Sequence, residues 1–148
     1  MKNFLRSAQD YELFIYTLTE QFPSIRRFTL QFIRVGSTMA RVNGILYFDK
    51  DTRLVVRERV LYDRMPAVID EYGYEVWQGE NKLYWYDAQP HPNDPSLEST
   101  FPYHEHIPPD IKHNRVPAPG MQFTSANLPI LIHEIETLLA PTTAQQPE

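Results

Sequence analysis

The spacing of apolar residues at the start of the chain predicts an amphipathic helix. Apolar side chains recur at intervals of three and four positions, at Leu5, Ala8, Tyr11, Ile15, Leu18 and Phe22. This interval places them on one stripe of a helix. Ser7, with Asp10 three residues later, is a suitable N-terminal cap. Pro23 ends the predicted helix, because the residue before a proline is pushed out of helical conformation.

The pattern then changes to an alternation of apolar and polar residues, which is typical of strands. It predicts five of them, at 26–35, 38–48, 53–62, 72–78 and 82–87. Tight links such as Gly79-Glu80-Asn81 join the strands, so neighbours pair antiparallel; parallel pairing would need long crossovers. The segment 64–70 contains Pro66, and the pattern leaves its conformation open.

A second amphipathic helix is predicted near the end of the chain. Asn127 is placed to cap it, Pro141 ends it, and its apolar stripe consists of Leu128, Leu131, Ile132, Ile135, Leu138 and Leu139. Each helix stripe must be buried against another surface. We therefore expect an α+β fold, an antiparallel meander of about five strands with both helices on one face. A chain of 148 residues suits one domain, 1–140, followed by a flexible tail, 141–148.

The composition narrows the cellular setting. There is no cysteine, which excludes disulfides and thiolate metal sites and is compatible with a reducing cytosol. Apolar runs are only a few residues long, against about 20 needed to cross a bilayer. The first residues also lack the apolar centre of a secretory signal. We expect a cytoplasmic protein that does not enter membranes.

Charge is unevenly distributed along the chain. The net charge is -5, yet residues 1–64 hold eleven Lys/Arg and seven Asp/Glu, and residues 65–148 hold three and twelve. This asymmetry favours a basic face that meets an anion, or two halves that neutralise each other in the fold. The candidate substrate-binding residues are arginines and tyrosines of the predicted strands: Arg41, Arg57, Arg59, Tyr84 and Tyr86. Tyrosines beside a cationic patch could stack on bases. The alternative is an ordinary polar outer face, with the arginines paired to Glu58 or Glu75.

Histidines gather in a proline-rich region. Residues 88–120 hold most of the thirteen prolines and four of the five histidines. The candidate catalytic residues are three of these histidines and a nearby acid: His91, His104, His106 and Asp87. Two imidazoles can act as general base and general acid on RNA without a cofactor, with Asp87 orienting one of them. Alternatively, the three histidines bind a zinc-like metal or are solvated loop residues.

Several stretches of the sequence carry a family resemblance. These are Tyr74-Glu-Val-Trp-Gln78, Leu83-Tyr-Trp-Tyr-Asp-Ala-Gln-Pro-His91 and Thr100-Phe-Pro-Tyr-His-Glu-His106. They resemble the TumE-type toxin family of prokaryotic toxin–antitoxin systems, whose pattern is Asp-x-x-Pro-His followed by Thr-Phe-Pro-x-His-x-His. The sequence departs from that pattern at Pro92, where a second His is often found, and at Trp85–Tyr86, where an Arg is found. If those groups matter to activity, this family member has an altered activity or is inactive.

The resemblance implies a growth-inhibiting toxin held by a cognate antitoxin, often a helix-turn-helix protein. We expect the toxin to act on RNA by metal-independent cleavage, which makes RNA a second expected partner. The alternatives are a non-enzymatic protein-binding module and a metal-dependent hydrolase that uses the loop histidines. The sequence predicts neither the RNA target nor the oligomeric state.

Overall fold

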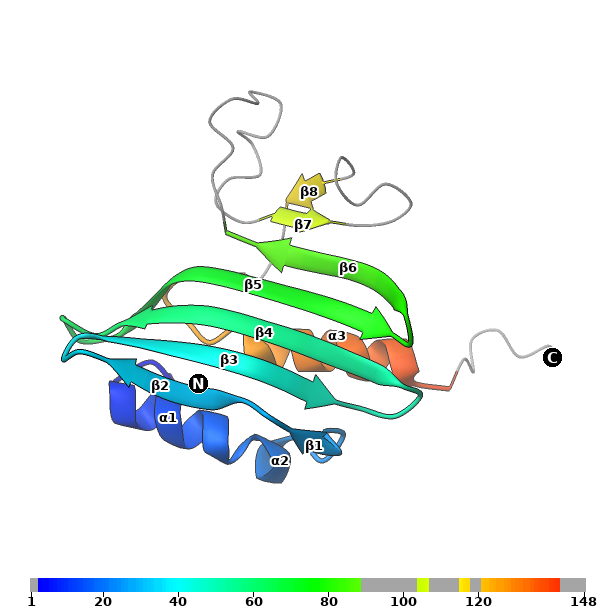
Figure 1. Ribbon diagram of the computed structural model, residues 1–148, viewed down its shortest axis with the longest axis horizontal. Helices are drawn as coiled ribbons and strands as arrows, with labels where there is room; N and C mark the ends of the chain where they lie inside the picture. Colours follow the sequence, from blue (N-terminus) through cyan, green and yellow to red (C-terminus); the bar gives the residue numbers. More distant parts are fainter. Residues whose placement is uncertain (1–2, 89–103, 107–114, 118–120, 142–148) are drawn as a thin grey trace.

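The computed structural model describes residues 3–88, 104–106, 115–117 and 121–141 (Figure 1). Within these residues the elements follow one another as α1 (Ala8–Tyr16), α2 (Leu18–Gln21), β1 (Arg27–Phe28), β2 (Gln31–Val35), β3 (Met39–Tyr47), β4 (Thr52–Leu61), β5 (Val68–Gln78), β6 (Asn81–Asp87), β7 (His104–His106), β8 (Arg115–Pro117) and α3 (Leu128–Leu139). Residues 142–148, most of the predicted flexible tail, lie outside the described part.

All described strands belong to one antiparallel sheet, so the predicted α+β class with an antiparallel meander is confirmed. β3 pairs with β1 and β2 on one side and with β4 on the other, and β4 to β8 then follow in chain order. Six strands, β1 to β6, form the body, and the three-residue strands β7 and β8 extend it (Figure 1). This extension brings part of the histidine-rich region onto the edge of the sheet.

The first predicted strand is divided in two at Thr29 and Leu30, which the alternation of apolar residues did not indicate. Leu30 lies opposite Gly44 of β3 and is buried. A Cβ on Gly44 would lie 2.6 Å from the Leu30 Cα and 2.6 Å from the Thr29 carbonyl oxygen. The chain can therefore bend inward here only because β3 has no side chain at this position.

The first predicted helix is interrupted as well, at Thr17. The Thr17 hydroxyl donates a hydrogen bond of 2.8 Å to the Leu13 carbonyl, which competes with the backbone for that acceptor. The predicted cap at the start of this helix is confirmed, because the Ser7 hydroxyl accepts a 3.1 Å hydrogen bond from the Asp10 backbone N–H.

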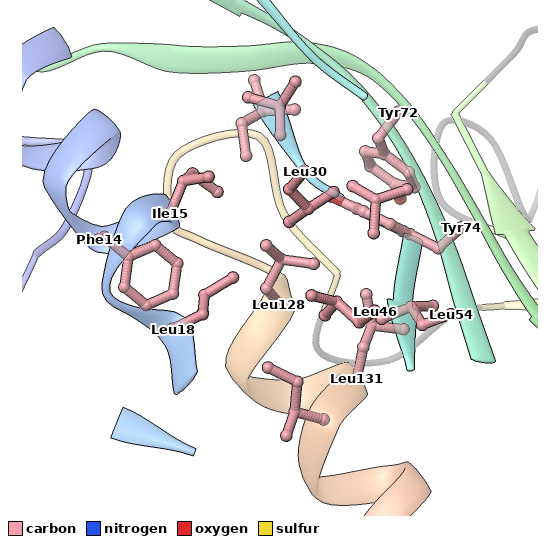
Figure 2. Packing of buried hydrophobic residues seen from close by; sticks show 14 of the residues in the cluster. Phe14, Ile15, Leu18, Leu30, Leu46, Leu54, Tyr72, Tyr74, Leu128 and Leu131 are labelled. Atoms are coloured by element: carbon pink, nitrogen blue, oxygen red, sulfur yellow. The ribbon is translucent and has the colours of Figure 1, made fainter. Parts of the chain in front are cut away.

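One hydrophobic core fills the space between the helices and the sheet (Figure 2). Figure 2 shows Phe14, Ile15 and Leu18 from the N-terminal helices beside the α3 residues Leu128 and Leu131. These side chains belong to the same buried cluster as the inward-facing strand residues Leu46, Leu54, Tyr72 and Tyr74. Truncation of such a fully buried leucine to alanine typically costs about 2–5 kcal/mol. The shared core is what holds α1 and α3 to the same face of the sheet.

A buried carboxylate lies within this core and hydrogen-bonds to residues of α1 and β5. Glu58 of β4 is 1 % exposed and accepts hydrogen bonds of 2.5 Å from the hydroxyls of Tyr11 and Tyr74. Burial raises the pKa of Glu58 to about 7, because desolvation outweighs the opposing effect of the two hydroxyl donors. The interpretation of Glu58 as an outer-face partner for arginines is therefore wrong: its neighbours Arg57 and Arg59 point outward, and Glu58 points inward.

Asn127 precedes α3 as predicted, but its side chain makes no capping hydrogen bond to the helix. It is fully buried and bonds elsewhere. Its Oδ1 accepts from the Gln122 backbone N–H at 2.8 Å, and its Nδ2 donates to the Gln122 carbonyl and to the Tyr74 hydroxyl. The side chain thus ties the loop before α3 to β5, and the prediction of a side-chain cap is wrong.

Candidate functional site

The outer face of the sheet, which points away from the three helices, carries the three predicted substrate-binding arginines. Arg41 of β3 lies opposite Arg59 of β4 in the register, and Arg57 lies two positions before Arg59 on the same strand. Positions two apart on a strand share a face. Arg41 and Arg57 are exposed, and Arg59 is half-buried. The structure brings the three residues together, and their role in binding substrate stays a prediction.

Arg59 is already paired with two carboxylates. Its guanidinium donates to Asp70 at 2.9 and 2.6 Å and lies 3.0 Å from the Glu71 Oε2 atom. A β-bulge explains the double contact: the register between β4 and β5 shifts after Arg59, so that Asp70 is the extra residue. The hydrogen bonds that Arg59 donates to Asp70 raise the pKa of the Arg59 guanidinium. Much of its charge is therefore neutralised within the fold.

Arg57 is placed differently. It lies opposite Gly73 of β5, and a Cβ on Gly73 would lie 2.8 Å from the Arg57 Cζ atom. The guanidinium therefore extends across β5, over the position where a side chain would be. Neither Arg57 nor Arg41 forms an ion pair with any residue in the described part of the chain. Their charges are more available to an anion than that of Arg59.

Asp87, the predicted acid, ends β6 on the same outer face. It is half-buried, and the Trp85 Nε1–H donates to its Oδ2 atom at 3.3 Å. In the register between β6 and β7, Asp87 lies directly opposite His104, and Trp85 lies opposite His106. Residues opposite each other in an antiparallel pair have Cβ atoms about 4.5–5.5 Å apart. The backbone register thus places His104 directly opposite the predicted acid, and His106 two positions further along β7.

One further described position, on β8, lies beside this edge. Arg115 of β8 lies opposite His106 in the register, a neighbour that the sequence pattern did not indicate. His106 and Arg115 lie nine positions apart in sequence, in a region without a regular apolar period, so no local pattern indicates that they pair. The remaining predicted catalytic residue, His91, lies outside the described residues and stays a prediction.

The two predicted substrate-binding tyrosines lie on the other side of the sheet from the arginines. The hydroxyl of Tyr86 donates to Glu134 of α3 at 2.8 Å, and the hydroxyl of Tyr84 lies 3.4 Å from the same carboxylate. Burial raises the pKa of Glu134, against the effect of the tyrosine donors. The structure therefore does not bring Tyr84 and Tyr86 to the face that carries Arg57.

Other aromatic residues occupy the outer face instead. The Nζ atom of Lys82 lies 3.6 Å from the centroid of the Trp85 ring, and Arg53 lies over Trp77 at 5.0 Å. A second β-bulge, in β6, shifts the register between Tyr84 and Lys82 and brings Lys82 to the face of Trp85. Strict alternation groups Lys82 with Tyr84, so the sequence pattern could not identify this set.

Among the described residues, no group of three His, Asp or Glu side chains is arranged to hold a metal ion. The metal alternative rests on His91, His104 and His106, and it stays a prediction. Among the described helices, none combines the length and the apolar character that crossing a bilayer requires.

Comparison with known proteins identifies the class. A family model described as toxin TumE matches residues 15–139, most of the chain. The protein is therefore a toxin of the toxin–antitoxin kind, and it belongs to the TumE family. Membership implies a cognate antitoxin as its partner in general terms. Searches among curated proteins and among solved structures each found no significant match.

Proposed function

We propose that this toxin acts by cleaving RNA, without a metal ion, on the outer face of the sheet where β6 and β7 meet. The observation that carries the proposal is the register that places His104 opposite Asp87 and His106 opposite Trp85. Two histidines, an acid and nearby guanidinium groups are the set that general acid–base attack on a phosphodiester needs.

The proposed reaction transfers the phosphoryl group within the RNA strand. One imidazole takes the proton of the 2′-hydroxyl, whose oxygen then forms a bond to phosphorus. The bond from phosphorus to the 5′-oxygen breaks, and a second imidazole, as imidazolium, protonates the leaving oxygen. The products are a 2′,3′-cyclic phosphate and a 5′-hydroxyl, so the atoms balance without an outside reactant. We assign these two roles to two of the three histidines His91, His104 and His106, with Asp87 holding one imidazole in its productive tautomer.

The outer face also offers binding groups for a single strand. Arg41 and Arg57 supply charge for phosphates, and the rings of Trp77 and Trp85 provide apolar surface beside the cations that cover them. Affinity based on such contacts is sensitive to salt, because phosphate binding releases counterions.

We also propose that the cognate antitoxin is a helix-turn-helix protein. This part of the proposal rests on the family resemblance alone.

The test is cleavage of a single-stranded RNA by the purified protein in the presence of EDTA. The wild type and the His133→Ala variant are expected to cleave it, and His104→Ala is expected to lose at least about 100-fold in rate. His133 is the matched control, since it is an exposed histidine that belongs to helix α3 and not to the sheet, and it contacts Glu136 of the same helix. The products should carry cyclic phosphate ends.

Each of the other outcomes would support a different function or mechanism. RNA that stays intact, with or without added divalent metal, would favour the non-enzymatic binding module. Cleavage that EDTA abolishes and zinc restores would favour the metal-dependent hydrolase. Equal rates for the wild type and His104→Ala would remove the histidine mechanism, whatever the source of the cleavage.

A further inference from the structure

The interior of β5 contains a glycine at the centre of the outer face. Glycine is unfavourable within a strand and commonly marks a place where another group approaches the backbone closely. At Gly73 the approaching group is the guanidinium of Arg57, which occupies the space of the missing side chain. A methyl group there would displace a flexible side chain and not the backbone. The sheet itself does not require glycine at this position.

Gly73 lies in a row of residues that crosses four strands. The register pairs Arg57 with Gly73, Gly73 with Asp87, and Asp87 with His104. Neighbouring strands lie about 4.8 Å apart. Because Gly73 has no side chain, Arg57 reaches from β4 across β5 toward Asp87. A longer side chain at position 73 would separate the cation from the carboxylate and histidine positions.

Arg57 differs from its neighbour Arg59 in what already binds it. Asp70 and Glu71 hold Arg59 through three contacts of 3.0 Å or less, whereas Arg57 pairs with no carboxylate in the described residues. A planar guanidinium can bind two phosphate oxygens at once, which gives it both charge and directional hydrogen bonds. Of Arg57 and Arg59, Arg57 is the one that can donate these bonds to a ligand.

We propose that Arg57, seated over Gly73, is the phosphate-binding group of the site formed by Asp87 and His104, and that Gly73 is the positioning residue that allows this. The inference rests on the proposed ribonuclease function and specifies its substrate contact. The ligand is the scissile phosphodiester of single-stranded RNA. Negative charge that develops on that phosphate is stabilised by the guanidinium, which the absence of a side chain at Gly73 allows to lie over β5.

The experiment compares four variants with the wild type: Gly73→Ala, Arg57→Ala, Arg57→Lys and, as a control outside the candidate site, Arg26→Ala. Cleavage of a short RNA is measured under single-turnover conditions, and unfolding in urea is measured for each protein. Gly73→Ala and Arg57→Ala are expected to slow cleavage by about 100-fold or more. Arg57→Lys should not restore the wild-type rate, because an ammonium group lacks the bidentate geometry. Arg26→Ala should change the rate by less than about threefold, because Arg26 donates two hydrogen bonds of 2.8 Å to Asp49 and is not one of the predicted site residues.

Binding of a 2′-deoxy oligonucleotide, which has the phosphates but no 2′-hydroxyl, separates positioning from folding. The slope of log affinity against log salt concentration should fall by about 0.7 in Arg57→Ala, which loses one phosphate contact, and stay unchanged in Arg26→Ala. Gly73→Ala should unfold at the wild-type urea concentration or above it, since alanine suits a strand at least as well as glycine. A purely structural role for Gly73 would lower stability and leave the salt slope of the folded protein unchanged.

The failures of the two proposals are distinguishable. A wild-type protein that cleaves RNA, with Gly73→Ala and Arg57→Ala cleaving at the same rate, would overturn the role of Arg57 and leave the ribonuclease proposal standing. A wild-type protein that leaves RNA intact would overturn both.

Discussion

The hydroxyl of Tyr11 donates a 2.5 Å hydrogen bond to the carboxylate of Glu58, so that helix α1 is fastened to the centre of β4 through a buried ionisable group. Tyr74 of β5 donates to the other oxygen of the same carboxylate, and Asn127 donates to the Tyr74 hydroxyl. The chain of donors connects α1, two strands and the loop before α3. Because it runs through a titratable group, the stability of the whole domain depends on pH.

Stability is expected to fall as pH rises from 5 to 8. Burial raises the pKa of Glu58 from its ordinary value of 4.5 to about 7, so over this interval the folded state keeps a proton that the unfolded chain releases. The stabilisation is fully present below pH 4.5 and is lost as pH rises through about 7, with a total of up to about 3 kcal/mol. Tyr11 and Tyr74 stay protonated throughout, because burial raises the pKa of each.

Urea unfolding of the wild type and Glu58→Gln at several pH values measures this effect. Glutamine keeps the shape and cannot titrate, so its stability should vary less with pH; the remaining slope belongs to Glu134, whose pKa burial also raises. If the stability of Glu58→Gln changed with pH as much as that of the wild type, groups other than Glu58 would cause the pH dependence.

Asn127 is expected to matter as a tie between segments and not as a helix cap. Asn127→Ala removes three hydrogen bonds of a fully buried side chain and should lower the free energy of unfolding by about 2–3 kcal/mol. Asn127→Ser tests the distinction, because serine caps helices well but is too short to make the same bonds. Serine should destabilise nearly as much as alanine. Recovery of most of the lost stability by serine would show that capping is the dominant role.

The sequence predicted the features that depend on local periodicity. The apolar stripes of α1 and α3 and the alternation of β3 and β4 each follow from burial on one side. The bounds of β3, β4 and α3 agree with the prediction to within a few residues, whereas the first predicted helix is divided at Thr17 into α1 and α2. Ser7 was identified as a cap because the interaction is local, three residues apart. Alternation likewise groups Arg57 and Arg59 on one face of their strand, whereas the position of Arg41 opposite Arg59 depends on how two strands pair.

What could not be predicted depends on partners distant in sequence. The bulge at Asp70 determines that Arg59 is paired, and the bulge in β6 brings Lys82 to the face of Trp85. A shift of one residue reverses the face of every following side chain. The tyrosines that were expected beside the arginines bond to Glu134, a contact across about fifty residues. No period within a strand encodes such contacts.

Gly44 is expected to be far less tolerant of substitution than Gly73, although both lie in strands. A Cβ on Gly44 would collide with the backbone of Thr29 and Leu30, and its φ of 149° is rare for residues with a side chain. Gly44→Ala should therefore destabilise the protein by more than about 2 kcal/mol. Gly73→Ala is the matched comparison, because its Cβ meets only the flexible Arg57 side chain. Thermal unfolding of both variants measures the difference; equal midpoints would show that the backbone at Leu30 can move aside.

Tyr86→Phe is expected to affect stability and leave RNA binding unchanged. The Tyr86 hydroxyl bonds to both oxygens of Glu134, at 3.0 and 2.8 Å, on the helix side of the sheet. Its removal should cost about 1–2 kcal/mol, because a half-buried carboxylate loses its best donor. Tyr84→Phe should cost less, since that hydroxyl lies 3.4 Å from the same carboxylate. Neither change alters the outer face, so the affinity for a 2′-deoxy oligonucleotide should match the wild type. A clear loss of affinity in either variant would mean that nucleic acid binds on the helix side, and it would contradict a site built around Arg57 and Asp87.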